Sequence, residues 1–205
     1  DIANAENKFN YENWEEIVRQ QEHKQGYQFT DEQIAGIKTG LDNQVCFITG
    51  GAGVGKSSLV SGILESLKDY TFAQTALAGK ASARLQEVTG EEGFTIHRLL
   101  GFNPSLGFTF NEDNPLEYDI IILDEISLVG GEIFLSLLKA IPNGSKLIIL
   151  GDMGQLESIG CMNLAFDLYK SKSIVTIELT KVHRQAQKSG IITTSQQIRK
   201  GQPVL

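Results

Sequence analysis

Short apolar runs alternate along the chain with longer, more polar stretches of helical length. The apolar runs predict five strands, at Val45–Thr49, Thr71–Leu77, Tyr118–Leu123, Lys146–Leu150 and Ile174–Leu179. The stretches between them predict helices near residues 57–67, 80–88, 131–140 and 161–170. Strands joined by helices form βαβ units, in which the strands run parallel and are buried on both faces. The predicted fold class is therefore α/β, a mostly parallel sheet flanked by helices.

The N-terminal segment differs from the alternating pattern that follows it. Trp14, Ile17 and Val18 lie at positions i, i+3 and i+4, which predicts a short amphipathic helix. We expect residues 1–27 to form a helical lead-in and residues 28–205 to form one domain, since this length suits a single hydrophobic core. The chain begins with Asp1 rather than Met, so we also expect it to be part of a longer protein.

Composition narrows the classes of protein to which the chain can belong. Hydrophobic residues make up 41% and charged residues 21%, which excludes a wholly disordered chain. The 18 Lys and Arg against 25 Asp and Glu give a net charge of −7, so any contact with nucleic acid has to be local. No apolar run approaches the ~20 residues of a membrane-spanning helix, and the polar start is unlike a signal peptide. We expect a cytoplasmic protein with no membrane partner.

The two cysteines, Cys46 and Cys161, are far apart and belong to no Cys/His cluster. This spacing excludes a zinc site and a disulfide framework, and it fits a reducing compartment. Cys46 lies in an apolar run, which predicts a small core residue.

Residues 50–57 read Gly-Gly-Ala-Gly-Val-Gly-Lys-Ser, a complete G-x-x-x-x-G-K-[ST] phosphate-binding loop between a predicted strand and a predicted helix. With Gly near ~7% of residues in proteins, a chance match is roughly a one-per-cent event, so an accidental glycine-rich turn is the weaker interpretation. Lys56 is expected on the β- and γ-phosphates and the Ser57 hydroxyl on Mg²⁺. The residues predicted to hold the nucleotide are Gly51, Ala52, Gly53, Val54, Gly55, Lys56, Ser57 and Ser58.

Polar residues follow two further predicted strands. Asp124 and Glu125 come directly after the apolar run 120–123, and the carboxyl ends of parallel strands are where open α/β sheets bind ligands. Asp124 is expected to hold Mg²⁺, and Glu125 to orient and deprotonate an attacking water, which favours hydrolysis over binding alone. Gln155, after the run 146–150, is expected to reach the γ-phosphate or that water. The alternative interpretation of both segments is a solvated polar turn after a core strand.

The phosphate loop, the Asp124–Glu125 pair and the segment with Gln155 occur in the order of motifs I, II and III of superfamily 1 helicases. Further segments match the same family in order, and together they resemble its RecD-like branch, the α-subunit type of exodeoxyribonuclease V. The resemblance covers roughly residues 28–201, and the additional matching segments are Phe29–Gln33, Gly79–Leu85, Thr95–Leu100, Asn114–Leu116 and Leu179–Gln185.

The resemblance implies a 5′-to-3′ DNA helicase that hydrolyses ATP with Mg²⁺ between two RecA-like motor domains and translocates on single-stranded DNA. Residues 28–205 would be the first motor domain, and the second is expected beyond Leu205. Subunits of a helicase–nuclease complex are further expected partners. By the same resemblance, Gln33 would bind adenine, Arg184 would be the arginine finger, and residues 101–117 would form a small strand-separating β-hairpin. The residues in segments that contact DNA would be Lys80, Arg84 and His97.

Each of these assignments has a plainer alternative. Thr30-x-x-Gln33 is also a capping box, which is compatible with adenine binding. Lys80 and Arg84, at i and i+4, would also suit a solvated helix face. His97 among apolar residues could be a packed core histidine, and Arg184 could pair with a surface acid.

Three other functional classes are alternatives to the helicase. A GTPase switch requires a DxxG motif and an NKxD base reader, and the chain has neither at the matching positions. A phosphotransferase requires an Arg-rich lid, which is also missing from the sequence. A non-motor ATPase of AAA type, or an ATP-gated binding module, stays open as the alternative to a motor.

Overall fold

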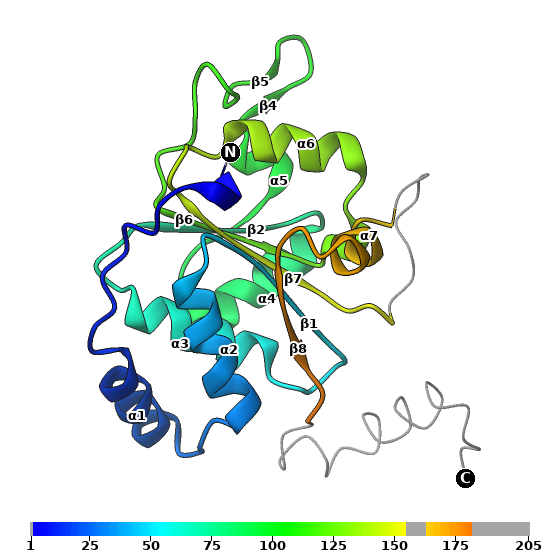
Figure 1. Ribbon diagram of the computed structural model, residues 1–205. Helices are drawn as coiled ribbons and strands as arrows, with labels where there is room; N and C mark the ends of the chain where they lie inside the picture. The colour runs from blue at the N-terminus through cyan, green and yellow to red at the C-terminus, as the bar shows by residue number, and fades with distance from the viewer. Residues whose placement is uncertain (1, 155–162, 182–205) are drawn as a thin grey trace, which may run out of the picture.

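The computed structural model describes residues 2–154 and 163–181 and consists of one parallel sheet covered by helices on both faces (Figure 1). The sheet has six strands in the order β3-β2-β6-β7-β1-β8, and all five neighbouring pairs are parallel. Their bounds are β1 Val45–Gly50, β2 Phe72–Ala76, β3 Gly93–Thr95, β6 Ile120–Asp124, β7 Lys146–Gly151 and β8 Val175–Leu179. The predicted α/β class is confirmed.

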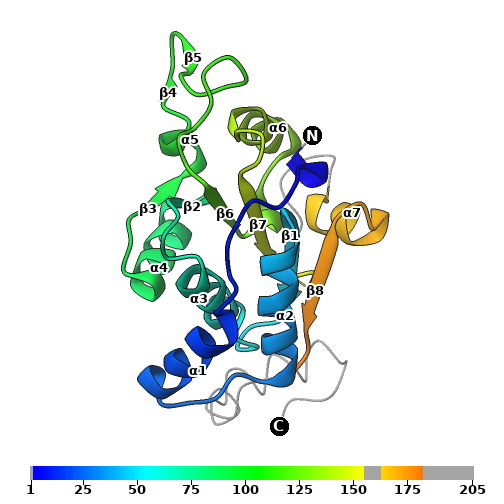
Figure 2. The ribbon, with the colours of Figure 1, turned by 60° about the vertical axis from the view of Figure 1, so that its left-hand side comes forward.

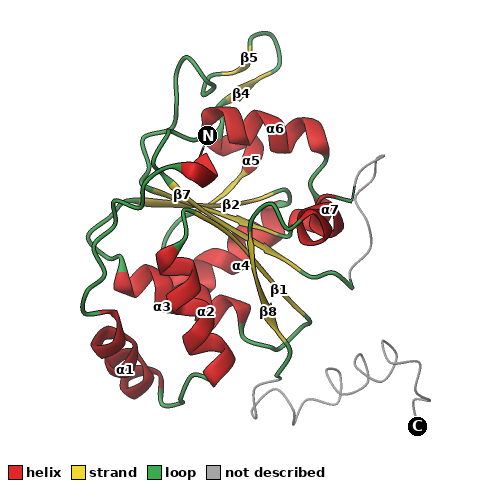
Figure 3. Cartoon of the chain, in the orientation of Figure 1, coloured by secondary structure: helices red, strands yellow, loops and turns green. Residues whose placement is uncertain are grey.

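Two helical layers enclose the sheet (Figures 2 and 3). One layer holds α1 (Trp14–Gln25), α2 (Asp31–Asp42), α3 (Lys56–Ser66) and α4 (Gly79–Thr89). The other holds the shorter α5 (Ile96–Leu99), α6 (Gly131–Ala140) and α7 (Leu164–Ser171). Two 3₁₀ turns, Ile2–Asn4 and Ile126–Leu128, complete the described elements besides a hairpin. No helix in the described part of the chain is long and apolar enough to cross a bilayer.

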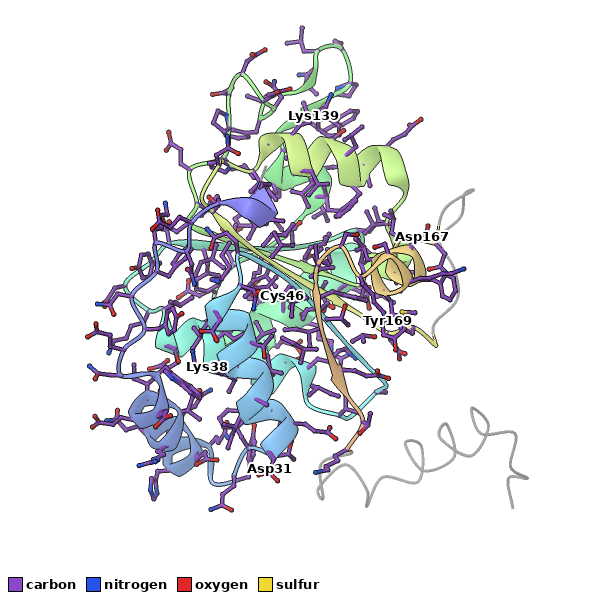
Figure 4. All side chains as sticks on the ribbon, in the orientation of Figure 1. Asp31, Lys38, Cys46, Lys139, Asp167 and Tyr169 are labelled. Atoms are coloured by element: carbon purple, nitrogen blue, oxygen red, sulfur yellow. The ribbon has the colours of Figure 1, made fainter. Side chains whose placement is uncertain are left out.

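Strand residues alternate between the two cores because successive side chains point to opposite faces of a strand. In β1, Cys46 and Ile48 pack under α2 and α3, whereas Phe47 packs on the opposite side with α5 and α6. All three are fully buried, and Cys46 lies in the interior of the molecule (Figure 4). The prediction that Cys46 is a core residue is confirmed.

The five strands predicted from the sequence are all present, with ends that differ by at most two residues. The strand β3 and the helix α5 were not predicted. The helix α2 was indicated only by its capping box, which the structure contains. Within 101–117, β4 (Phe102–Asn103) and β5 (Gly107–Phe108) pair as an antiparallel hairpin that projects from the α5–α6 side of the sheet (Figure 2).

A buried lysine anchors the end of α2. Lys146, the first residue of β7, is 0% exposed, and its Nζ donates to the carbonyl oxygens of Gly40 (2.9 Å), Leu41 (3.2 Å) and Asn43. Its ammonium also lies 5.1 Å from the centroid of the Phe9 ring. Orphan carbonyls at a helix C-terminus favour a cation, so Lys146 closes α2 against the sheet. Burial nevertheless lowers the pKa of Lys146 to about 8.

We predict that this lysine makes stability depend on pH. Because its folded pKa lies below its unfolded value, the folded state binds fewer protons between pH 8 and 10, and stability rises with pH there. From pH 7 to pH 9, the unfolding free energy of the wild type should rise by about 1 kcal/mol relative to Lys146→Met, measured by denaturant titration. The buried Cys46 thiol is common to both proteins and largely cancels. A pH-independent difference would contradict the lowered pKa.

Candidate nucleotide-binding site

The carboxyl ends of three neighbouring strands meet at one edge of the sheet. Thr49 of β1 pairs with Gly151 of β7, and Leu123 of β6 pairs with Ile149 of β7. This register brings the segments after β1, β6 and β7 together around a cavity of about 340 Å³. Its lining residues are Tyr27, Gly51, Ala52, Gly53, Gly55, Lys56, Ser57, Ser58, Arg84, Asp124, Glu125, Leu150, Gly151 and Asp152.

A larger cavity of about 640 Å³ lies beside α6 and α7. Its lining is mainly apolar, with residues such as Phe134, Leu138, Leu147 and Leu168. A pocket of this kind offers few donors to a phosphate. The smaller, polar cavity is therefore the candidate site.

The phosphate loop has the backbone that its glycines predict. Gly55 is the residue before α3 and adopts φ 87°, and an added Cβ would lie 2.2 Å from Gln33 Nε2. Only glycine fits this conformation and this close approach. The eleven-residue helix α3 then starts at Lys56, so its unpaired N–H groups and positive dipole end face the cavity.

Lys56 lies folded back on the loop. Its Nζ donates to the carbonyl oxygens of Gly50 (2.7 Å) and Gly51 (3.2 Å). Carbonyl oxygens satisfy an ammonium less strongly than the oxygens of a phosphate, because charge-assisted pairs are the stronger ones. A bound nucleotide would therefore offer Lys56 better partners than the loop does.

Gln33 connects the loop to the start of α2. Its Oε1 accepts from Thr30 N (2.9 Å) and its backbone N–H donates to Thr30 Oγ1 (3.2 Å), which forms the capping box. Its Nε2 donates to Gly55 O at 3.1 Å, and the residue is 1% exposed. The side chain thus braces both the helix and the phosphate loop. Its contact with adenine stays a prediction.

The two carboxylates lie together after β6. Glu125 N donates to Asp124 Oδ1 at 2.7 Å, and Glu125 adopts φ 55°, a conformation rare outside glycine that is typical of functional turns. Burial raises the pKa of Asp124, against the lowering effects of the Glu125 N–H, Lys56 and Arg84. Burial and the charge of Asp124 raise the pKa of Glu125, and Arg84 opposes them. A raised pKa suits a group that must accept a proton near neutral pH.

The donor set fits a magnesium ion only if the nucleotide completes it. Ser57 and Asp124 line the same cavity. Residues 2–154 and 163–181 contain no group of three His, Cys, Asp or Glu that could hold a metal. Mg²⁺ typically takes one or two protein ligands together with phosphate oxygens and waters. Ser57 and Asp124 are therefore the residues that would hold it.

The three residues predicted to bind DNA lie in different places. Arg84 lines the nucleotide cavity, whereas Lys80, one turn earlier on α4, is exposed and outside it. His97 lies at the base of the hairpin, with its ring centroid 5.4 Å from that of Phe102 and 6.0 Å from that of Phe108. Contact of these side chains with DNA stays a prediction.

Four residues that line the cavity were not among the predicted site residues, namely Tyr27, Leu150, Gly151 and Asp152, and two of these have polar side chains. Tyr27 contributes its hydroxyl, 3.2 Å from Ser58 Oγ, and Asp152 is 4% exposed and accepts from Gly154 N at 2.9 Å. Asp152 follows a buried strand and could have been included on that ground. Nothing in the spacing around Tyr27 indicates its position.

Gln155 and Arg184 lie outside the described residues. The described chain before Arg184 is held by Glu32, whose carboxylate accepts from Thr180 N (2.9 Å), Thr180 Oγ1 (2.8 Å) and Lys181 N (3.1 Å). Burial acts to raise the pKa of Glu32, but these hydrogen bonds outweigh burial, and the pKa is lowered. The start of α2 is thus joined to the end of β8 as well as to the phosphate loop.

Comparison with known proteins agrees with this geometry. A family model described as an AAA domain matches residues 33–161, which include the phosphate loop and both carboxylates. The chain belongs to this AAA domain family. Within the family it is RecD-like, since it is 38% identical over 178 residues to the ATP-dependent RecD2 DNA helicase of Deinococcus radiodurans. That match covers 84% of this chain and 24% of the relative.

Other relatives extend the likeness. The RecD subunit of the RecBCD enzyme of Mycolicibacterium smegmatis is 32% identical over 80% of this chain and 35% of its own length. The crystal structure of Pif1 helicase from Candida albicans superposes with a TM-score of 0.61 at 27% identity, covering 86% of this chain and 45% of that one. The RecD-like chain therefore spans about a quarter to a third of these curated relatives.

We predict that Gln33→Glu separates capping from loop bracing in this RecD-like chain. A glutamate can still accept from Thr30 N and complete the capping box, but it has no N–H to donate to Gly55 O. Its carboxylate would instead face that carbonyl and repel it. Because the side chain is 1% exposed, the buried charge should also lower the melting temperature. In the folded protein, ADP affinity measured by calorimetry should fall about tenfold, the equivalent of about 1.4 kcal/mol.

The matched control is Gln86→Glu, which adds the same charge at an exposed site on α4 outside the cavity. It should leave ADP affinity within about twofold of the wild type. Equal ADP affinity in Gln33→Glu and wild type would show that the contact with Gly55 does not shape the loop.

Proposed function

We propose that this chain is the first RecA-like motor domain of a DNA helicase that couples ATP hydrolysis to 5′-to-3′ translocation on single-stranded DNA. The observation that carries the proposal is the juxtaposition of a complete phosphate loop with Asp124 and Glu125 at one sheet edge. The likeness to the RecD2 helicase and to the RecD subunit supports the motor over other nucleotide hydrolases.

The residues of the cavity divide the chemistry among them. Loop N–H groups and the start of α3 hold the phosphates, and Lys56 moves from the loop carbonyls to the β- and γ-phosphates. Ser57 and Asp124 would hold Mg²⁺, which would neutralise charge on the phosphates when bound. Glu125 accepts the proton of the water that attacks the γ-phosphorus, and ADP leaves on the opposite side.

Residues beyond the described part complete the proposed site. Gln155 would orient the attacking water, and Arg184 would place a second positive charge on the γ-phosphate. An arginine finger contributes ~10³–10⁵ in rate when it is correctly placed. A second motor domain of the same protein would close over the adenine and the DNA, so we expect the 205-residue piece alone to hydrolyse ATP poorly.

The partners follow from the same proposal. Single-stranded DNA would run across α4 and the segment from Thr95 to Leu100, with Lys80, Arg84 and His97 as the candidate contacts. With a net charge of −7, affinity for DNA would rest on a few local cations and would fall with salt. The hairpin β4–β5 would meet the duplex at the fork. Subunits of a RecBCD-like helicase–nuclease complex are further candidate partners, in view of the relatives named RecD.

A non-motor ATPase is the competing proposal, and it lacks a specific observation in its favour. It predicts ATP hydrolysis that single-stranded DNA does not stimulate. The motor predicts stimulation, because DNA would bridge the two motor domains.

We predict that the full-length protein unwinds a duplex with a 5′ single-stranded tail and leaves 3′-tailed and blunt duplexes intact, in an ATP-dependent strand-displacement assay. Glu125→Gln should still bind Mg-ATP but lose turnover and unwinding by at least ~100-fold, since an amide does not accept the proton. Glu132→Gln, an exposed change in the first turn of α6, should behave like the wild type.

Unwinding from a 3′ tail would contradict the assigned polarity. Turnover of Glu125→Gln within about twofold of the wild type would show that Glu125 is not the base. ATP hydrolysis that is insensitive to single-stranded DNA would favour the non-motor ATPase.

A further inference from the structure

Arg84 is a cation of the nucleotide cavity, and its guanidinium has no hydrogen-bond or ion-pair partner among the described residues. It lies on α4, and it lines the cavity together with Asp124 and Glu125. In the ranges 2–154 and 163–181, its side chain makes no hydrogen bond or ion pair. By contrast, Arg98 pairs with Glu92 at 2.8 Å, and Lys56 is bound to the loop carbonyls.

The charges around the cavity show where Arg84 acts. The charge of Lys56 acts to lower the pKa of Asp124, whereas the charge of Arg84 acts to lower the pKa of both Asp124 and Glu125. Both carboxylates and both cations line the same cavity, Lys56 from the phosphate loop and Arg84 from α4. The γ-phosphate of a nucleotide held by the loop has to reach toward these carboxylates, since they hold Mg²⁺ and the attacking water in the proposed function.

A guanidinium at that end of the cavity suits a terminal phosphate. Its planar fork offers two parallel N–H donors to the oxygens of a phosphate, and such charge-assisted pairs are strong. Neither Asp124 nor Glu125 forms an ion pair with the guanidinium of Arg84 in this structure. Its N–H groups can therefore donate to a ligand. ADP has no phosphate at this position.

We propose that Arg84 binds the γ-phosphate of ATP and thereby distinguishes ATP from ADP. The inference rests on the proposed nucleotide site but reassigns Arg84, which its segment predicts to contact DNA. Helix α4 begins at Gly79 and carries the exposed Lys80 in its first turn. One rigid helix would then join the segment predicted to meet DNA to the phosphate that is cleaved.

The test compares two ligands in the full-length protein. Affinities for ADP and for the non-hydrolysable analogue AMPPNP are measured with Mg²⁺ by calorimetry for wild type, Arg84→Gln and Arg84→Lys. Arg84→Gln should weaken AMPPNP at least tenfold and ADP less than twofold. Arg84→Lys should recover part of the loss, since lysine keeps the charge without the planar fork.

The matched control is Arg19→Gln, an exposed helical arginine on α1 outside the cavity, which should leave both affinities unchanged. Equal weakening of ADP and AMPPNP by Arg84→Gln would overturn the proposal. So would unchanged AMPPNP affinity combined with weaker binding of a single-stranded oligonucleotide, which would make Arg84 a DNA contact. If the wild type bound neither ADP nor AMPPNP, the proposed nucleotide site itself would fail, which separates the two outcomes.

Discussion

The parallel pairing of β1, β6 and β7 is the constraint on which the site depends. Their central residues are fully buried on both faces of the sheet, so polar side chains that need water or a ligand are left to the strand ends. Because all three strands run in the same direction, their carboxyl ends lie at one edge. The phosphate loop, the Asp124–Glu125 pair and Asp152 are together for this reason.

Helix α2 runs between the edge formed by the carboxyl ends of the strands and the edge formed by their amino ends. Its first turn braces the phosphate loop through Gln33 and holds the end of β8 through Glu32. Its last turn is closed by Lys146, which stands at the amino end of β7. A twelve-residue helix is about 18 Å long, enough to link the two edges of the sheet. The loop is therefore positioned by a helix that is itself fixed at both ends.

The sequence was informative where one local pattern decides the structure. Apolar runs located five strands, and residues 50–57 specified the phosphate loop with its strand and helix. It was less informative where packing decides. Gly36 lowers the helix propensity of α2, yet an added Cβ there would lie 2.5 Å from Leu59 Cδ1, so a larger residue would have to displace the Leu59 side chain of α3. The strand β3 is three residues long and exists through its pairing with β2.

The site shows the same division between local and tertiary information. Lys56, Asp124 and Glu125 lie where motif and strand end predict, whereas Arg84 and Tyr27 reach the cavity through tertiary packing. Periodicity places Arg84 and Lys80 on one helix face, but it does not show that only Arg84 lines the cavity. The dual use of the Gln33 amide, in a capping box and on Gly55, likewise depends on how α2 packs against the loop.

The central claim is that this sheet edge binds the nucleotide and that Lys56 exchanges loop carbonyls for phosphate. A crystal structure of the full-length protein with Mg²⁺, ADP and aluminium fluoride tests it most directly. We expect the phosphates at the start of α3 and Lys56 Nζ beyond hydrogen-bond distance of Gly50 O, in contact with phosphate oxygens. A nucleotide bound elsewhere, or Lys56 still on Gly50 O with the nucleotide in place, would contradict the account.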